Sequence, residues 1–402
     1  MSSAELPIEP MLSAAERRWN LATAISCVTV FGVGIGLAWP LRSLLLETRG
    51  VEATVNGLNG ASAFLGVIIG PLLAPMIIRR TGLRPFLVGC LALDTVLFLS
   101  LKLLDDIVLW FALWMAMGIV GSGLFTATEA WITTTAGDKA RGRVIGLYAA
   151  SLSFGFMIGP LVLSLTGFVG WPPFVAGAAI NGVAALPFLF TRNSTAGFGK
   201  GTPLTFVAVF VRAPVIVLAV MLFGFYESAA VTILPIWGVR IGFDPRVAAA
   251  LLSALYLGSI ALQWPIGILS DRVSRLLVLR LCTAAGLAGA VLLPFVSTTM
   301  FPLFAVVLLW GGFASGLYPV ALSMAGDRFR GTEMVTANAV LIMGYGVGSS
   351  LGPVIGGVAM DLWNPHGVPA EFVLVFAAFL LLTAFAEPAR STARPPIRRS
   401  ER

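Results

Sequence analysis

Twelve long apolar segments divide this chain of 402 residues. They lie near residues 20–45, 53–78, 85–104, 107–136, 143–167, 172–191, 214–239, 246–270, 276–297, 300–325, 333–360 and 370–387. An α-helix needs about 20 residues to cross the hydrocarbon core of a bilayer, and each segment reaches or approaches that length. Lipid offers the backbone no hydrogen-bonding partner, so spanning segments of this kind must be helical. The segments therefore predict an all-α membrane protein with twelve transmembrane helices.

The charged residues support this prediction and give it an orientation. Only 11% of the residues are charged, whereas a soluble domain carries about 25%. If the N-terminus is cytoplasmic, all 26 Lys and Arg residues lie on the cytoplasmic side except Arg42, Arg49, Lys102, Arg240 and Arg246. The positive-inside rule then predicts a multi-pass protein of the inner (plasma) membrane with both termini in the cytoplasm. The net charge of +7 is thus a topology signal, and we expect no nucleic-acid partner.

A stretch that includes Ser122-Gly123-Leu124 and Gly159-Pro160 occurs twice. Its second copy holds Ser315-Gly316-Leu317 and Gly352-Pro353, nearly half a chain later. Such a repeat in a membrane protein indicates two pseudo-symmetric helical bundles with a site between them. The expected parts are a cytoplasmic N-terminal tail (1–19), six-helix bundles at 20–191 and 214–387, a cytoplasmic linker (192–213) and a basic cytoplasmic tail (388–402).

The loop between the eighth and ninth segments carries a recognisable pattern. It reads Gly267-Ile-Leu-Ser-Asp-Arg-Val-Ser-Arg275, which resembles the loop signature of the major facilitator superfamily. The equivalent loop of the first half departs from that signature, because Arg79 stands where the acidic residue is expected. This departure is typical of the YcaD-like branch of the superfamily. Three other motifs also resemble that branch: Pro40-Leu41-Arg42, Glu129-Ala130-Trp131 and Gln263-Trp264-Pro265. The resemblance covers essentially the whole chain.

This resemblance implies a secondary active transporter that works by alternating access. In that fold, spans 1, 4, 7 and 10 line a central cavity, and spans 3, 6, 9 and 12 face lipid. We expect a monomer with no cofactor and no metal, whose partners are a small-molecule substrate, protons and the lipid bilayer. We also expect a cytoplasmic gate in which Asp271 pairs with Arg141 or Arg143. The predicted gate residues are Arg80, Arg141, Arg143, Asp271 and Arg272.

Two carboxylates inside the predicted spans are the candidate proton-coupling residues. Glu129 lies in the fourth span on a face with Ser122 and Thr126, and Glu227 lies near the middle of the seventh. A carboxylate at that depth is costly unless it is paired, hydrated or protonated, and such residues are functional by default. Glu129 and Glu227 can therefore carry protons or bind a substrate amine, or they can make structural bonds to neighbouring helices. For Asp94, on a peripheral span, we expect a structural hydrogen bond.

Polar and aromatic side chains inside the spans are the candidate substrate-binding residues. An arginine near the outer end of the first span, Arg42, can attract an anionic substrate or extend to the membrane interface. Tyrosines and tryptophans offer an aromatic surface with a polar group, and amides can equally bond helix to helix. The candidates are Arg42, Asn59, Trp131, Tyr226, Gln263, Tyr318 and Tyr345.

The residues favour a transporter over two other classes of membrane protein. A transport-inactive receptor or scaffold has no need of Glu129 and Glu227. A membrane-embedded enzyme is disfavoured, since the single histidine, His366, lies in a predicted outer loop and no metal-binding or nucleotide-binding motif accompanies it. We therefore predict a secondary transporter and not an enzyme. Efflux of a drug or metabolite and uptake of an organic anion both remain open.

Overall fold

The computed structural model describes residues 13–104, 106–136, 141–190, 206–329 and 332–385. Every regular element in these ranges is a helix. The first half holds α1 (Ala14–Thr48), α2 (Ala53–Thr81), α3 (Leu83–Leu103), α4 (Ile107–Thr135), α5 (Arg141–Thr166), α6 (Pro172–Ala185) and a 3-10 helix, η1 (Leu186–Phe190). The second half holds α8 (Pro214–Arg240), α9 (Pro245–Arg272), α10 (Arg275–Val296), α11 (Met300–Ser315), α12 (Leu317–Arg328), α13 (Thr332–Leu362) and α14 (Gly367–Ala384).

The predicted all-α membrane fold is confirmed, with three local differences. Among the described residues, 11 helices are long and apolar enough to cross a membrane, and the sixth predicted span is the shorter Pro172–Phe188. The tenth span is divided at Gly316 into α11 and α12, which together form one crossing, Met300–Arg328. A further short helix, α7 (Phe206–Arg212), lies inside the predicted linker.

Polar side chains fix where several of these helices begin. Ser13 and Glu16 form a capping box at the start of α1. Asp106 accepts hydrogen bonds from the first backbone N–H groups of α4, and Asp244 does the same for α9. These caps satisfy donors that have no partner within the helix. The helix ends are therefore set by short polar residues placed between apolar segments.

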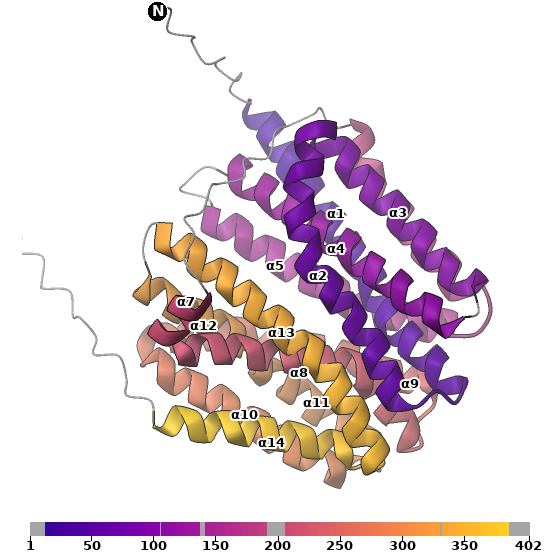
Figure 1. The fold of residues 1–402 in the computed structure, drawn as a ribbon, viewed down its shortest axis with the longest axis vertical. Helices are drawn as coiled ribbons and strands as arrows, with labels where there is room; N and C mark the ends of the chain where they lie inside the picture. The colour runs from indigo at the N-terminus through magenta and orange to yellow at the C-terminus, as the bar shows by residue number, and fades with distance from the viewer. Residues whose placement is uncertain (1–12, 105, 137–140, 191–205, 330–331, 386–402) are drawn as a thin grey trace, which may run out of the picture.

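The sequence repeat appears in the structure as three helix pairings that occur in both halves. α1 packs on α5 as α8 packs on α13, α2 on α4 as α9 on α11, and α3 on α6 as α10 on α14. Two further pairings join the halves, α2 with α13 and α5 with α9. Figure 1 shows α2 and α13 side by side at this junction. The repeat therefore produces two equivalent bundles.

Glycines from the repeated Gly-Pro motif allow α5 to pack closely on α1 and α13 on α8. A Cβ atom on Gly159 of α5 would lie 2.4 Å from the backbone of Gly36 in α1. The equivalent Gly352 of α13 would place a Cβ atom 2.2 Å from the carbonyl oxygen of Phe225 in α8. Small residues of this kind let membrane helices approach closely. The motif is thus duplicated because the same helix contact is made twice.

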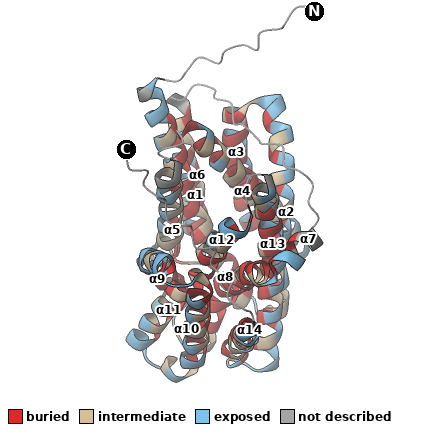
Figure 2. Ribbon diagram, turned by 90° about the vertical axis from the view of Figure 1, so that its left-hand side faces the viewer, coloured by how far each residue is buried: buried red, intermediate tan, exposed pale blue. Residues whose placement is uncertain are grey.

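The helix at the centre of the second half is also the most buried span. In Figure 2, α8 is mainly coloured as buried, whereas the helices around it expose one face. We call the end of the molecule with the α1–α2, α8–α9 and α13–α14 connections the distal end. The opposite end, from which α1 and α8 begin, is the proximal end. These names are independent of any membrane orientation.

Candidate functional site

Glu227, near the middle of α8, makes the principal polar contact between two central helices. The hydroxyl of Tyr345, on α13, donates a hydrogen bond of 2.9 Å to the Glu227 carboxylate. Both side chains are only partly buried. The bond joins two residues that the sequence analysis selected separately.

Aromatic rings surround this carboxylate. The ring centroid of Phe223, one helical turn before Glu227, lies 5.3 Å from that of Tyr318 and 6.0 Å from that of Tyr345. Tyr256, on α9, packs against the same hydrophobic core as these three rings and is likewise partly buried. We call Phe223, Glu227, Tyr256, Tyr318 and Tyr345 the Glu227 cluster. Its members come from α8, α9, α12 and α13, so the packing of four helices assembles it.

Glu129, on α4, is the candidate carboxylate of the other half. Its side chain is exposed, although its neighbours Thr128 and Trp131 are buried. No hydrogen bond or ion pair joins it to another described residue. The first half thus presents a carboxylate that no described residue binds.

Arg42, predicted to bind substrate, is buried, and both of its terminal nitrogens are engaged within the first half. One terminal nitrogen donates bonds of 3.0 Å to the carbonyl and side-chain oxygens of Asn56 and to the side-chain oxygen of Asn59. The other donates to the hydroxyl of Ser43 at 2.9 Å. The guanidinium also lies 5.4 Å from the ring centroid of Trp114. Arg42 and Asn59 therefore bind each other inside the first half.

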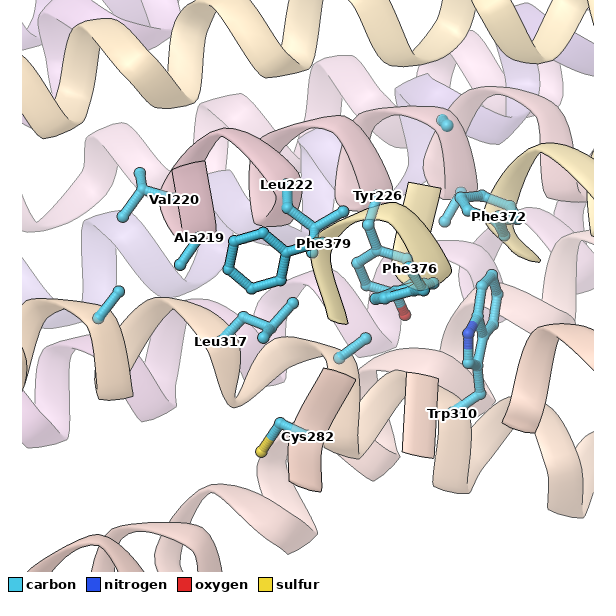
Figure 3. Close-up of a cluster of buried hydrophobic side chains, with 14 of the residues drawn as sticks. Ala219, Val220, Leu222, Tyr226, Cys282, Trp310, Leu317, Phe372, Phe376 and Phe379 are labelled. Atoms are coloured by element: carbon cyan, nitrogen blue, oxygen red, sulfur yellow. The ribbon is translucent and has the colours of Figure 1, made fainter. Parts of the chain in front are cut away.

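Two further predicted substrate residues are packed into apolar clusters. Tyr226 is 1% exposed and lies 4.9 Å, between ring centroids, from Trp310. Figure 3 shows it among Phe372, Phe376 and Trp310. Trp131 is 3% exposed, and its ring stacks on that of Phe188 at 6.2 Å. These two side chains stabilise the bundles and lie away from any exposed polar surface.

The predicted cytoplasmic gate lies at the proximal end. Arg80, Asp271 and Arg272 are exposed, and no bond joins Asp271 to another described residue. The side chains of Arg141 and Arg143 fall outside the described part of the chain. Another residue of the loop motif, Arg275, is the one that is bonded. It forms an ion pair with Asp327 and donates a hydrogen bond of 2.6 Å to the Ser323 carbonyl. Gln263 is exposed on α9.

The halves are joined by polar contacts at the distal end. Arg240, at the end of α8, pairs with Glu47 of α1 at 2.8 Å and with Asp361 of α13 at 3.6 Å. Asp361 also accepts hydrogen bonds from the backbone N–H groups of Ala53 and Thr54 at 3.1 and 2.8 Å. We call Glu47, Arg240, Asp361 and the first turn of α2 the distal latch. Asp361 therefore caps α2, a helix of the other half.

A second set of contacts closes the same end between α5 and α9. Ser253 donates to the carbonyl of Met157 at 2.9 Å, and Ser164 donates to the carbonyl of Arg246 at 2.8 Å. Within the described ranges, every hydrogen bond or ion pair that is recorded between the two halves lies in their distal part. The halves are consequently held together at one end.

Sequence reasoning missed the distal latch and one buried acid. The latch residues stand at predicted helix ends, where charged residues usually face solvent, so their positions gave no signal. Glu371, four residues into α14, is 4% exposed, and neither carboxylate oxygen has a partner in the described structure. Its place inside the twelfth predicted span was a signal that could have found it. For Asp94 the expected structural bond is confirmed, since Asn181 donates to it at 2.9 Å.

Comparison with known proteins adds the family to this geometry. The sequence model of the Major Facilitator Superfamily matches residues 24–255 and 216–402. The chain is 24% identical over 385 residues to the "uncharacterized MFS-type transporter YfkF" of Bacillus subtilis strain 168, covering 92% of this chain and 96% of that one. It is 26% identical to a protein of Shigella flexneri named "uncharacterized MFS-type transporter YcaD", with the same two coverages.

Solved structures show the same fold. The nucleoside transporter NupG superposes with a TM-score of 0.75 and 15% identity, covering 92% of this chain and 98% of NupG. A bacterial homologue of the human lysosomal transporter Spinster, in an inward-facing, unoccupied conformation, gives a TM-score of 0.72 at 15% identity and covers 93% of this chain and 96% of that one. At this identity the likeness concerns the fold alone.

Proposed function

The chain belongs to the Major Facilitator Superfamily, and from this premise we propose that it moves a small organic solute by proton-coupled alternating access. The family consists of membrane transporters, not enzymes. The chain is accordingly a multi-pass transporter in a lipid bilayer with a small-molecule substrate. Proton coupling, alternating access and the residues that perform them are the content of the proposal.

The observation that carries the proposal is the hydrogen bond of 2.9 Å that the Tyr345 hydroxyl of α13 donates to Glu227 of α8. A second carboxylate, Glu129, comes from α4 of the other half. Protonation of either acid removes a negative charge from inside the helical bundles. Protonation of Glu227 also changes the hydrogen bond that it accepts from Tyr345, and this bond joins α8 to α13. The proton-coupling role predicted for both acids stays our proposal.

The distribution of contacts between the halves supports alternating access. They are bonded in their distal part through the latch and the α5–α9 contacts. If both termini are cytoplasmic, as the basic residues predict, this conformation is closed to the outside. Transport then requires the bundles 20–191 and 214–387 to rock about the site, with the linker 192–213 joining them. Opening outward must break the distal latch.

The alternatives are less well supported. A receptor or scaffold gains nothing from a carboxylate such as Glu129 left without a partner. Uptake of an organic anion was suggested by Arg42, but that guanidinium is 2% exposed and already binds Asn56 and Asn59. We therefore leave Arg42, Asn59, Trp131 and Tyr226 out of the proposed site and keep Tyr318 and Tyr345, with Tyr256 added.

Spin-label distances in reconstituted protein test the proposal without a known substrate. Labels at Thr48→Cys and Trp363→Cys report the distal separation of the halves, in a background in which the buried Cys27, Cys90 and Cys282 are replaced by Ser. We expect the distance distribution to shift between acidic and alkaline buffer. The shift should vanish in the double variant Glu129→Gln/Glu227→Gln and persist in Glu333→Gln, an acid on the proximal part of α13. An undiminished shift in the double variant contradicts proton coupling through these residues.

A further inference from the structure

We infer that the substrate is an organic cation with an apolar body, whose ammonium group binds at Glu227 among the rings of Phe223, Tyr256, Tyr318 and Tyr345. This inference rests on the proposed transport function and names its substrate class. It is drawn from three properties of the Glu227 cluster: its charge, its aromatic rings and the state of its hydrogen-bonding groups.

The charge of the site is negative. Glu227 lies within the cluster, Glu129 is exposed on α4 of the other half, and neither forms an ion pair with a described residue. Arg42, a cation that the sequence offered for substrate binding, is already bonded to Asn56, Asn59 and Ser43. An anionic substrate would meet the Glu227 carboxylate with no described cation to bind it. A cationic substrate would meet a complementary field.

The rings suit an ammonium group rather than a flat apolar ligand alone. The ring centroid of Phe223 lies 5.3 Å from that of Tyr318 and 6.0 Å from that of Tyr345, and Tyr345 also contacts the carboxylate. The negative face of an aromatic ring attracts a cation, and sets of such rings recognise ammonium ligands. Each of these side chains keeps some accessible surface, in contrast to the buried Tyr226. The cluster therefore has the composition of an aromatic cage closed by an acid.

The aromatic surface of the cage continues onto the other half. Phe156, on α5 of the other half, lies 5.4 Å between ring centroids from Tyr256. A substrate that touches both rings would contact the two bundles at once. A polyhydroxyl solute fits less well, because the hydroxyl of Tyr345 is already donated to Glu227. The available surface is aromatic and acidic, which fits an amphipathic amine.

The same geometry links substrate binding to proton movement. A proton and an ammonium group are alternative ligands of the Glu227 carboxylate, so binding of one displaces the other. Exchange of a cation for a proton follows from this competition, with no bond made or broken in the substrate. The affinity for the cation should accordingly fall as the pH is lowered and Glu227 becomes protonated.

Three probes with the same carbon skeleton test the charge preference. Phenylbutylammonium, phenylbutanol and phenylbutyrate are titrated against the purified full-length protein, and binding is followed by thermal stabilisation. We expect stabilisation by the ammonium probe alone, and by its trimethylammonium form. Glu227→Gln should weaken binding roughly tenfold or more, which corresponds to about 1.4 kcal/mol. Glu333→Gln, which alters an exposed acid elsewhere, should leave it unchanged.

Two variants of Tyr318 test whether its aromatic ring is needed for ammonium binding. Tyr318→Phe keeps the ring and should retain ammonium binding within a few fold, whereas Tyr318→Leu should abolish it. Equal binding of the carboxylate or alcohol probe, or equal binding by Tyr318→Leu, overturns the cation assignment. So does the failure of every ammonium probe to bind a protein whose halves still respond to pH. Those outcomes leave the proposed transport function intact, since the label distances test it independently.

Discussion

At the scale of single residues, the first half is organised around a buried cation. Arg42 shares its charge among two asparagines, a serine and the ring of Trp114. Asn56 in turn donates to the carbonyl of Ser43 at 2.9 Å, so the group forms one network. A buried network whose members satisfy one another gives rigidity, and loses it when one member is removed.

We predict that Arg42→Ala lowers the stability of the protein by roughly 2–4 kcal/mol, because the oxygens of Asn56 and Asn59 lose a charged donor. Thermal unfolding in detergent measures the loss, and Arg42→Lys should recover part of it. A variant of unchanged stability that fails to bind an anionic solute would contradict the structural role of Arg42.

Glu371 gives the opposite expectation. Its carboxylate is buried between α13 and α14 beside Gly356, without a partner in the described part of the chain. We predict that Glu371→Leu raises stability by about 1–3 kcal/mol, since an unsatisfied buried polar group is removed. The unfolding temperature is the measurement, with transport as the accompanying readout. Loss of transport in a stable Glu371→Leu protein would instead assign this acid to the mechanism.

At the scale of helices, close approach at the α2–α13 junction depends on missing side chains. A Cβ atom on Gly57 would lie 1.9 Å from the carbonyl oxygen of Pro353, and one on Gly357 would lie 2.3 Å from that of Ala53. Both contacts cross between the halves near the distal latch. The latch can therefore form only because these helices meet backbone to backbone.

We predict that Gly57→Ala separates the halves at the distal end, because the added methyl group cannot share the space of the Pro353 carbonyl. The distance between labels at Thr48 and Trp363 should lengthen. Gly89→Ala is the control, since nothing lies within 4 Å of its Cβ position on α3. An unchanged distance in Gly57→Ala would show that this junction does not set the conformation.

The helices could be predicted from the sequence, but the side of each helix that faces the protein interior could not. Segment length and apolarity identified the twelve spans, since lipid admits few other structures. The apolar character runs around each span, because lipid-facing and core-facing surfaces are equally apolar. The sequence therefore could not distinguish Tyr226, which points into the core, from its neighbour Glu227, which points toward Tyr345. Glu129, Glu227, Tyr318 and Tyr345 stood out as candidates, but the convergence of the last three depends on packing between distant helices.

At the scale of the whole molecule, the distal latch stabilises the distally closed conformation relative to a distally open one. Asp361 both pairs with Arg240 and caps α2, so its carboxylate contributes an ion pair and two backbone hydrogen bonds. When the distal end opens, Asp361 must give up its bonds to α2 and Arg240 its pair with Glu47, whereas the Arg240–Asp361 pair lies within the second half. The latch thus sets part of the free-energy difference between the two conformations.

We predict that Asp361→Asn shifts the population of the distally open form about five- to tenfold, since the loss of an N-terminal cap and its charge costs roughly 1 kcal/mol or more. Labelling of a cysteine at the latch by an impermeant reagent measures the shift. Arg212→Gln is the matched control, because the Arg212–Glu333 pair at 3.2 Å joins α7 to the start of α13, at the end of the molecule opposite the latch. Equal labelling of Asp361→Asn and Arg212→Gln would contradict the role of the latch.

The two bundles are joined by the linker at one end, and at the other by an ion pair, a few hydrogen bonds and the packing of α2 on α13. That arrangement makes latch closure a reaction within a single molecule, in which each bundle experiences a high effective concentration of the other. Weak contacts then suffice to close the distal end, and they can break without risk that the bundles diffuse apart. The covalent linker at one end therefore allows the distal latch at the other end to open and close reversibly.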